Sequence, residues 1–341
     1  MSQAPPRRLR TWSRFGQIRR VPSDYEILTH DLNYTMREGR EAALESNPTT
    51  PANMWFLTYR DRSPLQADDW NGFRDPDELT YRKYVTLQDE QETVVEGILE
   101  EYTKVDHDAR LEARWLKVLA TVFTPMRYPT HALQMTQAYL GGFAPSSYIT
   151  NAASFAAADL LRRVSLIAYR TRQLQLAHPE VGFATGEREI WEDHPDWQPA
   201  RRALEAALIA YDWGECLSAV NLVLRPTLDE VLLRQLGLVA DANGDQLTWL
   251  LLGNLALDSD RNARWSAALV RYAIGRRREN AAVLRRWVER WAPRADAAAA
   301  GLARMLAELP QVGRDASVVT AAASAARERV LADAGLAAQI G

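Results

Sequence analysis

Five histidines are the residues of this chain best suited to bind a metal or to transfer a proton. A two-iron site in a helix bundle uses inward carboxylates and two Glu-x-x-His motifs, because residues three apart share a helix face. The residues three positions before His30, His107, His131, His178 and His194 are Ile27, Lys104, Tyr128, Gln175 and Trp191. No histidine therefore follows an acidic residue at that spacing, and HExxH is absent too. The sequence predicts no metal ligands, no bound cofactor and no catalytic residue in this chain.

The sequence also lacks the motifs of other common enzyme chemistries. There is no GxxxxGK[ST] loop for phosphates, no GxGxxG for dinucleotides and no GxSxG nucleophile turn. The single cysteine, Cys216, excludes an intrachain disulfide and suits a reducing cytoplasm. It stands in a helical pattern with no histidine near it in sequence, so we interpret it as a packing residue.

One helical stretch has the spacing of a metal motif but not its residues. The stretch AADLLRRVSLIAYRT, residues 157–171, is apolar on one side and contains no glycine or proline. At its centre Leu160 and Arg163 are three residues apart, the spacing of Glu-x-x-His. The stretch fits either an ordinary buried helix or a helix that has lost its metal.

Helical periodicity dominates the chain after residue 85. Pro226 should kink or break the helix it interrupts, and Gly275 is a plausible residue just after a helix end. We expect helices at about 130–142, 147–176, 187–192, 199–225 and 245–275, the last as one helix or a pair, and further helices around and after Pro293. Helices of 25–30 residues far exceed the usual ~11–12 residues. The sequence therefore predicts an all-α, ferritin-like bundle of long helices.

Composition and charge narrow the possible partners. The chain has 341 residues, 47 % of them hydrophobic, and a net charge of −3. These values are ordinary for a globular protein and argue against nucleic-acid binding. No apolar run is long enough for a membrane span. The first 20 residues contain six arginines and no acidic residue. This segment is either a basic arm for an acidic partner surface or a solvated tail, with a transit peptide as a weaker third interpretation.

The first 85 residues differ in character from the rest. Seven aromatic residues fall between residues 55 and 84, where the chain average of 9 % would give about three. Disordered segments are poor in aromatics, so this segment should lie on the chain's own core or on another subunit. We expect an arm for subunit contacts at 1–85, a helical core without metal ligands at 86–291 and C-terminal helices at 292–341.

Several segments resemble one known family. They are RTWSRFGQIRRVPSDYEILTHDLNY, ANMWFLTYRDRSPLQADDWNGFRDPDELTYRKY, QDEQE, APSSYITNAASFAAADLLRRVSLIAYRTRQL, YDWGECLSAVNLVLRP and ARWSAALVRYA. Together they resemble the beta hydroxylase subunit of soluble bacterial multicomponent monooxygenases, in the toluene, alkene and isoprene branch. The resemblance covers about residues 10–295, and the W-F-x-x-Y-R and D-P-D-x-L-x-Y-R-x-Y segments are specific.

The resemblance implies a place in a larger enzyme. The hydroxylase of that family is a dimer of three-subunit protomers, with alpha, beta and gamma chains. The alpha subunit holds the di-iron centre and the substrate cavity, and beta is its metal-free paralogue with the same ferritin-like, ribonucleotide-reductase-like fold. A reductase, often with a ferredoxin, and a small effector protein act on the complex, which oxidises an aromatic or alkene hydrocarbon with O2 and NADH.

The resemblance also aligns the lost ligands. Alpha-type D-E-L-R-H corresponds to residues 159–163, so Leu160 takes the Glu position and Arg163 the His position. Alpha-type D-E-A-R-H is similar to residues 261–265, which puts Asn262 and Trp265 in the same two positions. Arg225 and Asp229 are near one of the remaining carboxylate positions. An unpaired buried charge costs several kcal/mol. If Arg163 points inward, we therefore expect it to pair with Asp159 or with a carboxylate near Asp229 and Glu230; otherwise it extends to solvent or an interface.

Three functions remain open from the sequence: a non-catalytic scaffold of a hydroxylase, a self-sufficient di-iron oxidase, and an unrelated helical interaction or regulatory protein. The missing ligands and the aromatic segment favour the scaffold. Its subunit contacts are predicted at Trp12, Arg14, Trp55, Tyr59, Trp70, Phe73 and Tyr81.

Overall fold

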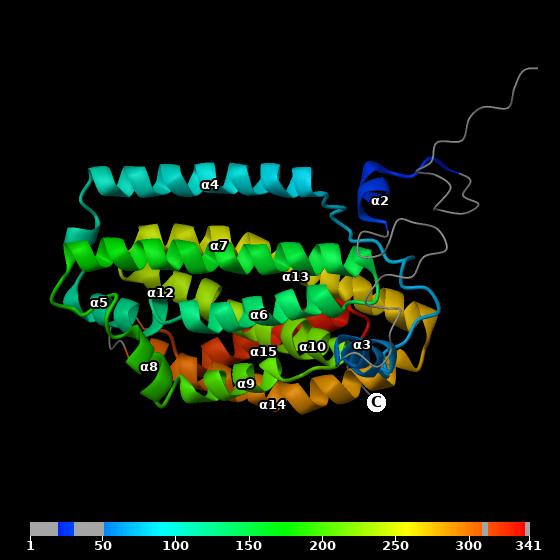
Figure 1. Cartoon of the computed structure of the whole chain (residues 1–341). Coiled ribbons are helices and arrows are strands. Elements are labelled where there is room, and N and C mark those ends of the chain that lie inside the picture. The colour runs from blue at the N-terminus through cyan, green and yellow to red at the C-terminus, as the bar shows by residue number, and fades with distance from the viewer. Residues whose placement is uncertain (1–19, 31–50, 309–312, 338–341) are drawn as a thin grey trace, which may run out of the picture.

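Long helices make up the body of the protein, as a computed structural model shows (Figure 1). The structure describes residues 20–30, 51–308 and 313–337, with no strand among them. The helices are α2 (Asp24–Thr29), α3 (Pro51–Phe56), η1 (Leu57–Asp61), α4 (Tyr81–Lys104), η2 (Asp108–Arg110), α5 (Ala113–Val118), η3 (Leu119–Phe123), α6 (Arg127–Phe143), α7 (Ser147–Ala177), α8 (Glu187–Asp193), α9 (Gln198–Leu208), α10 (Trp213–Leu217), η4 (Ser218–Leu224), α11 (Arg225–Asp229), η5 (Glu230–Gln235), α12 (Leu236–Ala242), α13 (Gln246–Arg276), α14 (Asn280–Ala307) and α15 (Ala316–Asp333). The predicted all-α bundle is confirmed.

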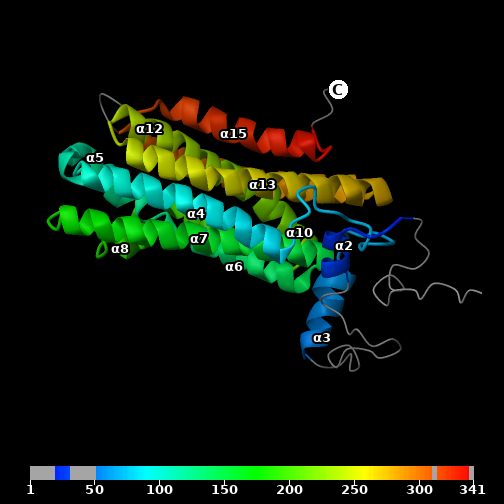
Figure 2. The same cartoon turned by 90° about the horizontal axis from the view of Figure 1, so that it is seen from above.

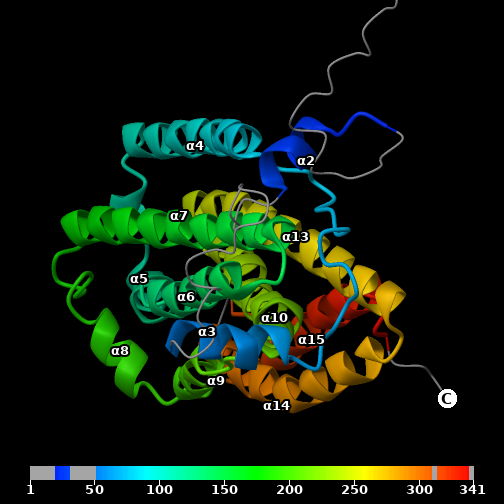
Figure 3. The same cartoon turned by 45° about the vertical axis from the view of Figure 1, so that its right-hand side comes forward.

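Two helical hairpins form the centre of the bundle. In the first, α6 and α7 lie side by side after a short connection, with Ser146 capping α7 through a bond from the backbone N–H of Tyr148. In the second, the helical run from residue 213 to 242 packs along α13 (Figures 1 and 3). Helix α7 spans 31 residues and ends at Ala177, in agreement with the expected helix at 147–176. Its length makes it the main strut of the fold.

The second hairpin contradicts one expectation. The chain breaks at residues 209–212, where Asp212 caps the next helix by accepting bonds from Gly214 and Glu215, and it continues through Pro226 without a break. The run before this proline is a π-helix, η4, in which the N–H of Arg225 bonds to the carbonyl of Val220, five residues back. This wider turn absorbs the proline, which lacks an N–H.

Helix α13 corrects a second expectation. It is one helix of 31 residues, and Gly275 lies inside its last turn, since the helix ends at Arg276. The turn before α13 requires a glycine at position 244. Gly244 adopts a φ of +79° there, a conformation that glycine tolerates at no steric cost. Asp245 then caps α13 by accepting a bond from the backbone N–H of Thr248.

An outer layer covers the two hairpins. Helices α9, α14 and α15 pack on the side away from α7 (Figure 1). Four fully buried tryptophans fill the interior, and these are Trp115, Trp197, Trp213 and Trp291. Helix α14 runs through Pro293 and is therefore continuous across the boundary drawn at residues 291 and 292. The division into three parts stays a prediction.

The aromatic-rich segment before α4 lies on the chain's own core. Leu65, Phe73 and Leu79 are buried there, and the ring of Trp70 meets Trp213 at 5.0 Å. The composition of the segment predicted a position on the chain's own core or on another subunit, and these residues lie on the chain's own core. No helix within the described ranges is long and apolar enough to cross a bilayer.

A close approach between α14 and the loop before α9 gives a test of the packing. A Cβ added at Gly301 would collide with the carbonyl oxygen of Asp196 and lie 3.2 Å from its carbon, whereas Gly253 on α13 has open space around it. We expect Gly301→Ala to lower the free energy of unfolding by about 1–3 kcal/mol. The control Gly253→Ala should raise it by about 0.5–1 kcal/mol. Urea denaturation measures both, and equal effects would contradict the packing.

A buried ion cluster at the lost ligand positions

The four aligned ligand positions all lie in the interior. Leu160 and Arg163 on α7 are 0 % and 3 % exposed, and Asn262 and Trp265 on the neighbouring α13 are both 2 % exposed. None of these residue types supplies an iron ligand such as a carboxylate or an imidazole. The question is therefore what fills the space and balances the charge.

Arg163 is buried and paired, as predicted. Its Nη1 donates to Oδ1 of Asp229 at 2.6 Å and its Nη2 to Oδ2 at 3.2 Å, which is the two-pronged geometry that suits a guanidinium and a carboxylate. Nη2 also donates to the hydroxyl of Ser259 at 3.0 Å. The partner is the second of the two expected, on α11, and not Asp159 one turn away. The pair joins α7 to α11, and the bond to Ser259 adds α13.

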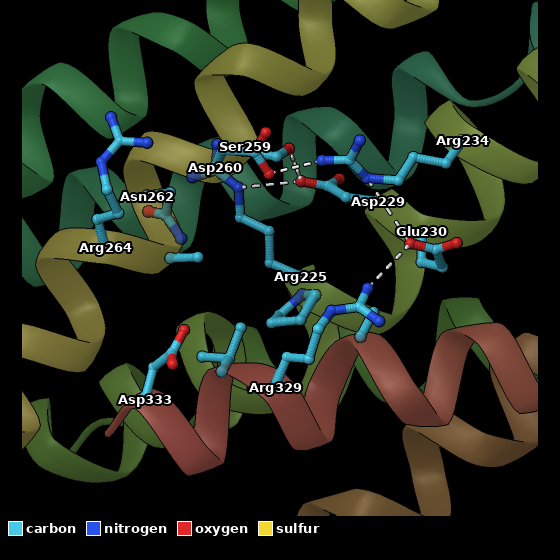
Figure 4. A pocket seen from close by; sticks show the side chains of 14 residues that line it. Arg225, Asp229, Glu230, Arg234, Ser259, Asp260, Asn262, Arg264, Arg329 and Asp333 are labelled. Carbon is cyan, nitrogen blue, oxygen red and sulfur yellow. Dashed lines mark hydrogen bonds and ion pairs between the residues drawn. The ribbon is translucent and has the colours of Figure 1, made fainter. Parts of the chain in front are cut away.

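A second arginine shares the same carboxylate. Arg225 is 1 % exposed, and its Nε donates to Oδ2 of Asp229 at 3.3 Å, while Ser259 donates to the same oxygen (Figure 4). The two outer nitrogens of Arg225 have no hydrogen-bond partner within the described parts of the chain. We call Arg163, Arg225, Asp229 and Ser259 the Asp229 cluster. The π-helices η4 and η5 flank α11, so a locally widened helix presents Arg225 and Asp229.

The ionisation of Asp229 follows from these contacts. Burial by itself would raise the pKa of this carboxyl. The charges of Arg163 and Arg225, with the hydrogen bonds from Arg163 and Ser259, outweigh burial and hold the pKa below its ordinary value. Asp229 is therefore an anion between two cations.

An open pocket of about 260 Å³ borders the Asp229 cluster (Figure 4). The charges that line it are balanced, with four arginines against four acids: Arg225, Arg234, Arg264, Arg329, Asp229, Glu230, Asp260 and Asp333. Arg234 bonds to Asp260 at 2.6 Å on its rim. This balance favours neither an anion nor a cation.

A second group of buried charges lies further along α7 and α13. Nη2 of Arg261 donates to Asp159 at 2.6 Å and to Asp258 at 2.8 Å. Arg162 donates to the other oxygen of Asp258 at 3.0 Å and to Asn254 at 2.6 Å. We call Asp159, Asp258, Arg261 and Arg162 the Asp159 cluster. It places two carboxylates between two guanidinium groups.

The Asp159 cluster also fixes helix α4. The hydroxyl of Tyr84 donates to Asp159 at 2.9 Å, and the amide of Gln88 donates to Asp159 at 3.0 Å and Asp258 at 3.3 Å. Arg162 reaches out to Gln91 and Glu92 on the same helix. Hydrogen bonds and an ion pair of α4 therefore converge on this cluster.

The environment of Asp159 shifts its ionisation in the opposite direction from that of Asp229. Burial is the main cause, and the neighbouring charge of Asp258 adds to it. Arg261 and Arg225 oppose these effects only in part, so the pKa of Asp159 rises to about 6. A carboxyl with this pKa changes its charge near neutral pH.

The space beside Asn262 and Trp265 is small. A cavity of about 10 Å³, lined by both residues with Asp159 and Arg261, has room for one water molecule. The Oδ1 of Asn262 and the Nε1 of Trp265 lack partners in the described structure, and they are an acceptor and a donor that one water could join. We expect a single ordered water there.

The residues present do not fit a di-iron centre. The four aligned positions hold Leu, Arg, Asn and Trp, and the adjacent arginines already carry positive charge where metal cations would add more. Within residues 20–30, 51–308 and 313–337, no group of three or more His, Cys, Asp and Glu could hold a metal ion.

Most of the Asp159 cluster has no counterpart among the sequence predictions. Those predictions include Asp159 as a possible partner of Arg163, but not Asp258, Arg261 or Tyr84. A signal was present, since α13 carries Asp258 and Arg261 three residues apart, between the apolar Leu255 and Trp265. Charges at helical spacing on a buried face indicate partners on a facing helix.

The predicted contact residues have different environments. Trp55 and Tyr59 lie partly buried against Tyr211, Trp55 also bonds to the hydroxyl of Tyr139, and Trp70 is partly buried. Phe73 is 1 % exposed and belongs to the chain's own core, whereas Tyr81 is 76 % exposed. Trp12 and Arg14 lie outside the described residues. A role of these residues in subunit contacts stays a prediction.

Comparisons with known proteins agree on one family. The model described as Methane/Phenol/Alkene Hydroxylase matches residues 55–277. The toluene-4-monooxygenase hydroxylase subunit beta of Ectopseudomonas mendocina is 39 % identical over 306 residues, 90 % of this chain and 93 % of that relative. A chain from a solved structure of toluene 4-monooxygenase with bound toluene is 37 % identical, with a TM-score of 0.81 over 89 % of this chain and 99 % of that one. A phenol hydroxylase chain from Pseudomonas sp. OX1 shares the fold at 20 % identity, with a TM-score of 0.79 over 99 % of this chain and 98 % of that one.

The shared carboxylate of the Asp229 cluster can be tested by substitution. Asp229→Asn removes the anion between two buried cations, so we expect the free energy of unfolding to fall by about 3–5 kcal/mol. The double variant Arg163→Leu with Asp229→Leu removes both charges of the pair. Comparing it with Asp229→Asn separates the stability lost with the pair from the cost of leaving Arg163 without its partner. The control Glu192→Gln breaks the exposed pair Arg188–Glu192 and should change the stability little. Urea denaturation measures all three, and equal losses for Asp229→Asn and Glu192→Gln would contradict burial of the pair.

The raised pKa of Asp159 predicts a pH dependence. Its folded-state pKa of about 6 exceeds the ordinary value of 3.8, so its contribution to stability is full below about 4 and is lost as the pH rises through 6. Asp159→Asn keeps the acceptor oxygen and removes the titration. We expect the free energy of unfolding of the variant, relative to wild type, to increase from pH 4 to pH 6 with a slope of up to about 1.4 kcal/mol per pH unit. Denaturation series at several pH values measure this difference, and a flat difference would contradict the assignment.

Proposed function

This chain belongs to the methane/phenol/alkene hydroxylase family, and on that premise we propose that it is the beta subunit of the hydroxylase component of a multicomponent di-iron monooxygenase. The observation that carries the proposal is the nearly end-to-end match to a hydroxylase beta subunit, in a chain whose aligned ligand positions hold Leu160, Arg163, Asn262 and Trp265. The family match supports this function over the stand-alone helical protein that the sequence had left open.

In this proposal the reaction takes place on a partner. The alpha subunit holds the di-iron centre, and the complex uses O2 and NADH to oxidise an aromatic or alkene hydrocarbon. This chain has no catalytic residue and holds no cofactor. Its part is to support alpha and to help join two three-subunit protomers of alpha, beta and gamma chains, on which an effector protein and a reductase with its ferredoxin act. The complex is proposed to be cytoplasmic.

The residues of this chain fit a supporting role. Where alpha-type helices would hold metal, α7, α11 and α13 are joined by the Asp229 cluster. These bonds fix the spacing of the three helices without a removable ion. A subunit whose helices keep their spacing offers its partner a constant surface.

The contact arm is proposed at residues 1–85. Its described part includes the exposed ring of Tyr81 and the half-buried rings of Trp55 and Tyr59, which form an aromatic surface with Tyr139 and Tyr211. Aromatic residues are enriched in protein interfaces because they bury large areas at little entropic cost. The basic N-terminal stretch, with Trp12 and Arg14, is proposed to extend the same contact.

Co-expression tests the proposed function. The chain is produced alone and together with the iron-bearing hydroxylase subunit of the same organism, and iron content and molecular mass are measured for each. We expect iron and a large assembly only after co-expression. Stoichiometric iron in the isolated chain would indicate a self-sufficient oxidase. A stable monomer that does not associate with the iron-bearing subunit would indicate an unrelated helical protein.

A further inference from the structure

Helix α4 is an outer helix of the bundle, and its firmest attachment is in its N-terminal half, where Tyr84 bonds to Asp159 and stacks on Phe155 of α7. Of its 24 residues, only Tyr84 and Val95 are buried. Val95 packs with Leu247 and Leu251 of α13 in a small apolar cluster of its own. In Figure 2, seen from above, α4 lies on the near side of the bundle between α7 and α13. From Glu92 onward, the flank of α4 toward α7 is open.

A groove of about 840 Å³ lies between the C-terminal half of α4 and α7. Its apolar lining comes from both helices and consists of Val95, Leu99, Leu166 and Tyr169. The ring of Tyr169 is 53 % exposed. Elsewhere on α7, Leu161 and Leu176 are also exposed, at 48 % and 66 %. Apolar side chains that gather in an open groove indicate an interaction site.

The α4 wall of the groove is mainly acidic, and its one cation, Lys104, pairs with Glu101. Between residues 89 and 101, α4 has six acidic residues and no basic one. Glu92, Glu96 and Glu100 recur every four residues and therefore line the groove along one face of the helix. Glu96 and Glu100 are exposed and have no ion-pair partner within the described ranges. On the opposite wall, Arg162 is bound to Asp258 and Asn254 and also pairs with Glu92, so the acids of the wall without an ion pair in the described structure are Glu96 and Glu100.

A groove with an apolar lining and an acidic wall is suited to a segment that is apolar on one face and basic along its flank. We propose that the groove between α4 and α7 docks an amphipathic helix of a partner hydroxylase subunit, with apolar residues against Tyr169 and Leu99 and a Lys- or Arg-rich flank along α4. The stretch from Glu92 to Lys104 is about 18 Å long, which matches about three turns of a docked helix. This inference rests on the proposed function, which supplies such a partner.

Two other occupants have weaker support. A second copy of this chain docking α4 against α4 would bring the two acidic walls together, and like charges in contact cost several kcal/mol. The chain's own basic N-terminal stretch has suitable charge, but it would then be unavailable as the proposed arm. Crosslinking from within the groove distinguishes each of them from a partner helix.

Charge reversal on α4 tests the docking. Glu96→Lys with Glu100→Lys reverses the groove wall, whereas Asp89→Lys with Glu90→Lys makes the same change on the same helix outside the groove. Each variant is co-expressed with the iron-bearing subunit, and the dissociation constant of the complex is measured over a range of NaCl concentrations. We expect the groove variant to bind about tenfold or more weakly at low salt, with a smaller difference at high salt, and the control to change little.

A second pair of variants tests the apolar lining. Tyr169→Glu places a charge in the groove, and Val318→Glu places one at an exposed apolar position on α15, which does not line it. Only the first should weaken the complex. Wild-type affinity for both Tyr169→Glu and the groove charge variant, in a complex that does form, would overturn the docking and leave the proposed function intact. Failure of the wild-type chain to bind the iron-bearing subunit would instead refute the proposed function.

A photo-crosslinking residue at position 99 identifies the occupant in the assembled complex. We expect a crosslinked peptide from the partner subunit that is rich in Lys or Arg. A peptide from residues 1–19 of this chain, or from α4 of a second copy, would overturn the proposal.

Discussion

The bidentate pair between Arg163 and Asp229 is the interaction on which the centre of the bundle depends. Each charge is almost fully buried, so each would cost several kcal/mol without the other. The pair can form only when α7 and α11 have one particular spacing and rotation. Ser259 extends the constraint to α13 by accepting from Arg163 and donating to Asp229. Apolar packing alone would tolerate small shifts among these helices, whereas this pair does not.

The need to pair buried charges also determines how the outer helix α4 is held, through the Asp159 cluster. Two carboxylates share a buried site, which requires cations and donors around them. Arg261 and Arg162 supply the charge, and Tyr84 and Gln88 supply donors from α4. Because these donors lie in the N-terminal half of α4, that half is held close, while the C-terminal half packs mainly through a small apolar cluster with Leu247 and Leu251 of α13, next to Leu166 of α7. The open groove is thus a consequence of where the buried acids need their partners.

The sequence predicts this fold well where local signals suffice and poorly where distant contacts decide. Helix α7 is predictable to within a residue or two because the helical pattern continues with no glycine or proline until His178 and Pro179. The sequence predicts a kink or a break at Pro226, and the helical run continues there without a break, because a π-turn that absorbs a proline depends on packing from all sides and has no local signature. Among the charges, Asp229 can be anticipated from the cost of burying Arg163. Arg261 and Asp159 are 102 positions apart, so their contact becomes visible only in three dimensions.

Replacing metal by arginine changes what a bundle can do. A metal centre joins helices through ligands that must be deprotonated, and it releases them when the metal is lost. A guanidinium stays charged at every accessible pH and has no redox chemistry. The helices joined by Asp229 in this chain therefore keep their spacing whatever happens to iron elsewhere in the proposed complex. A catalytic metal site keeps an open coordination position for its reactants, whereas a supporting subunit needs a surface that stays constant. The buried ion pairs of this chain leave no such open position and meet the second requirement.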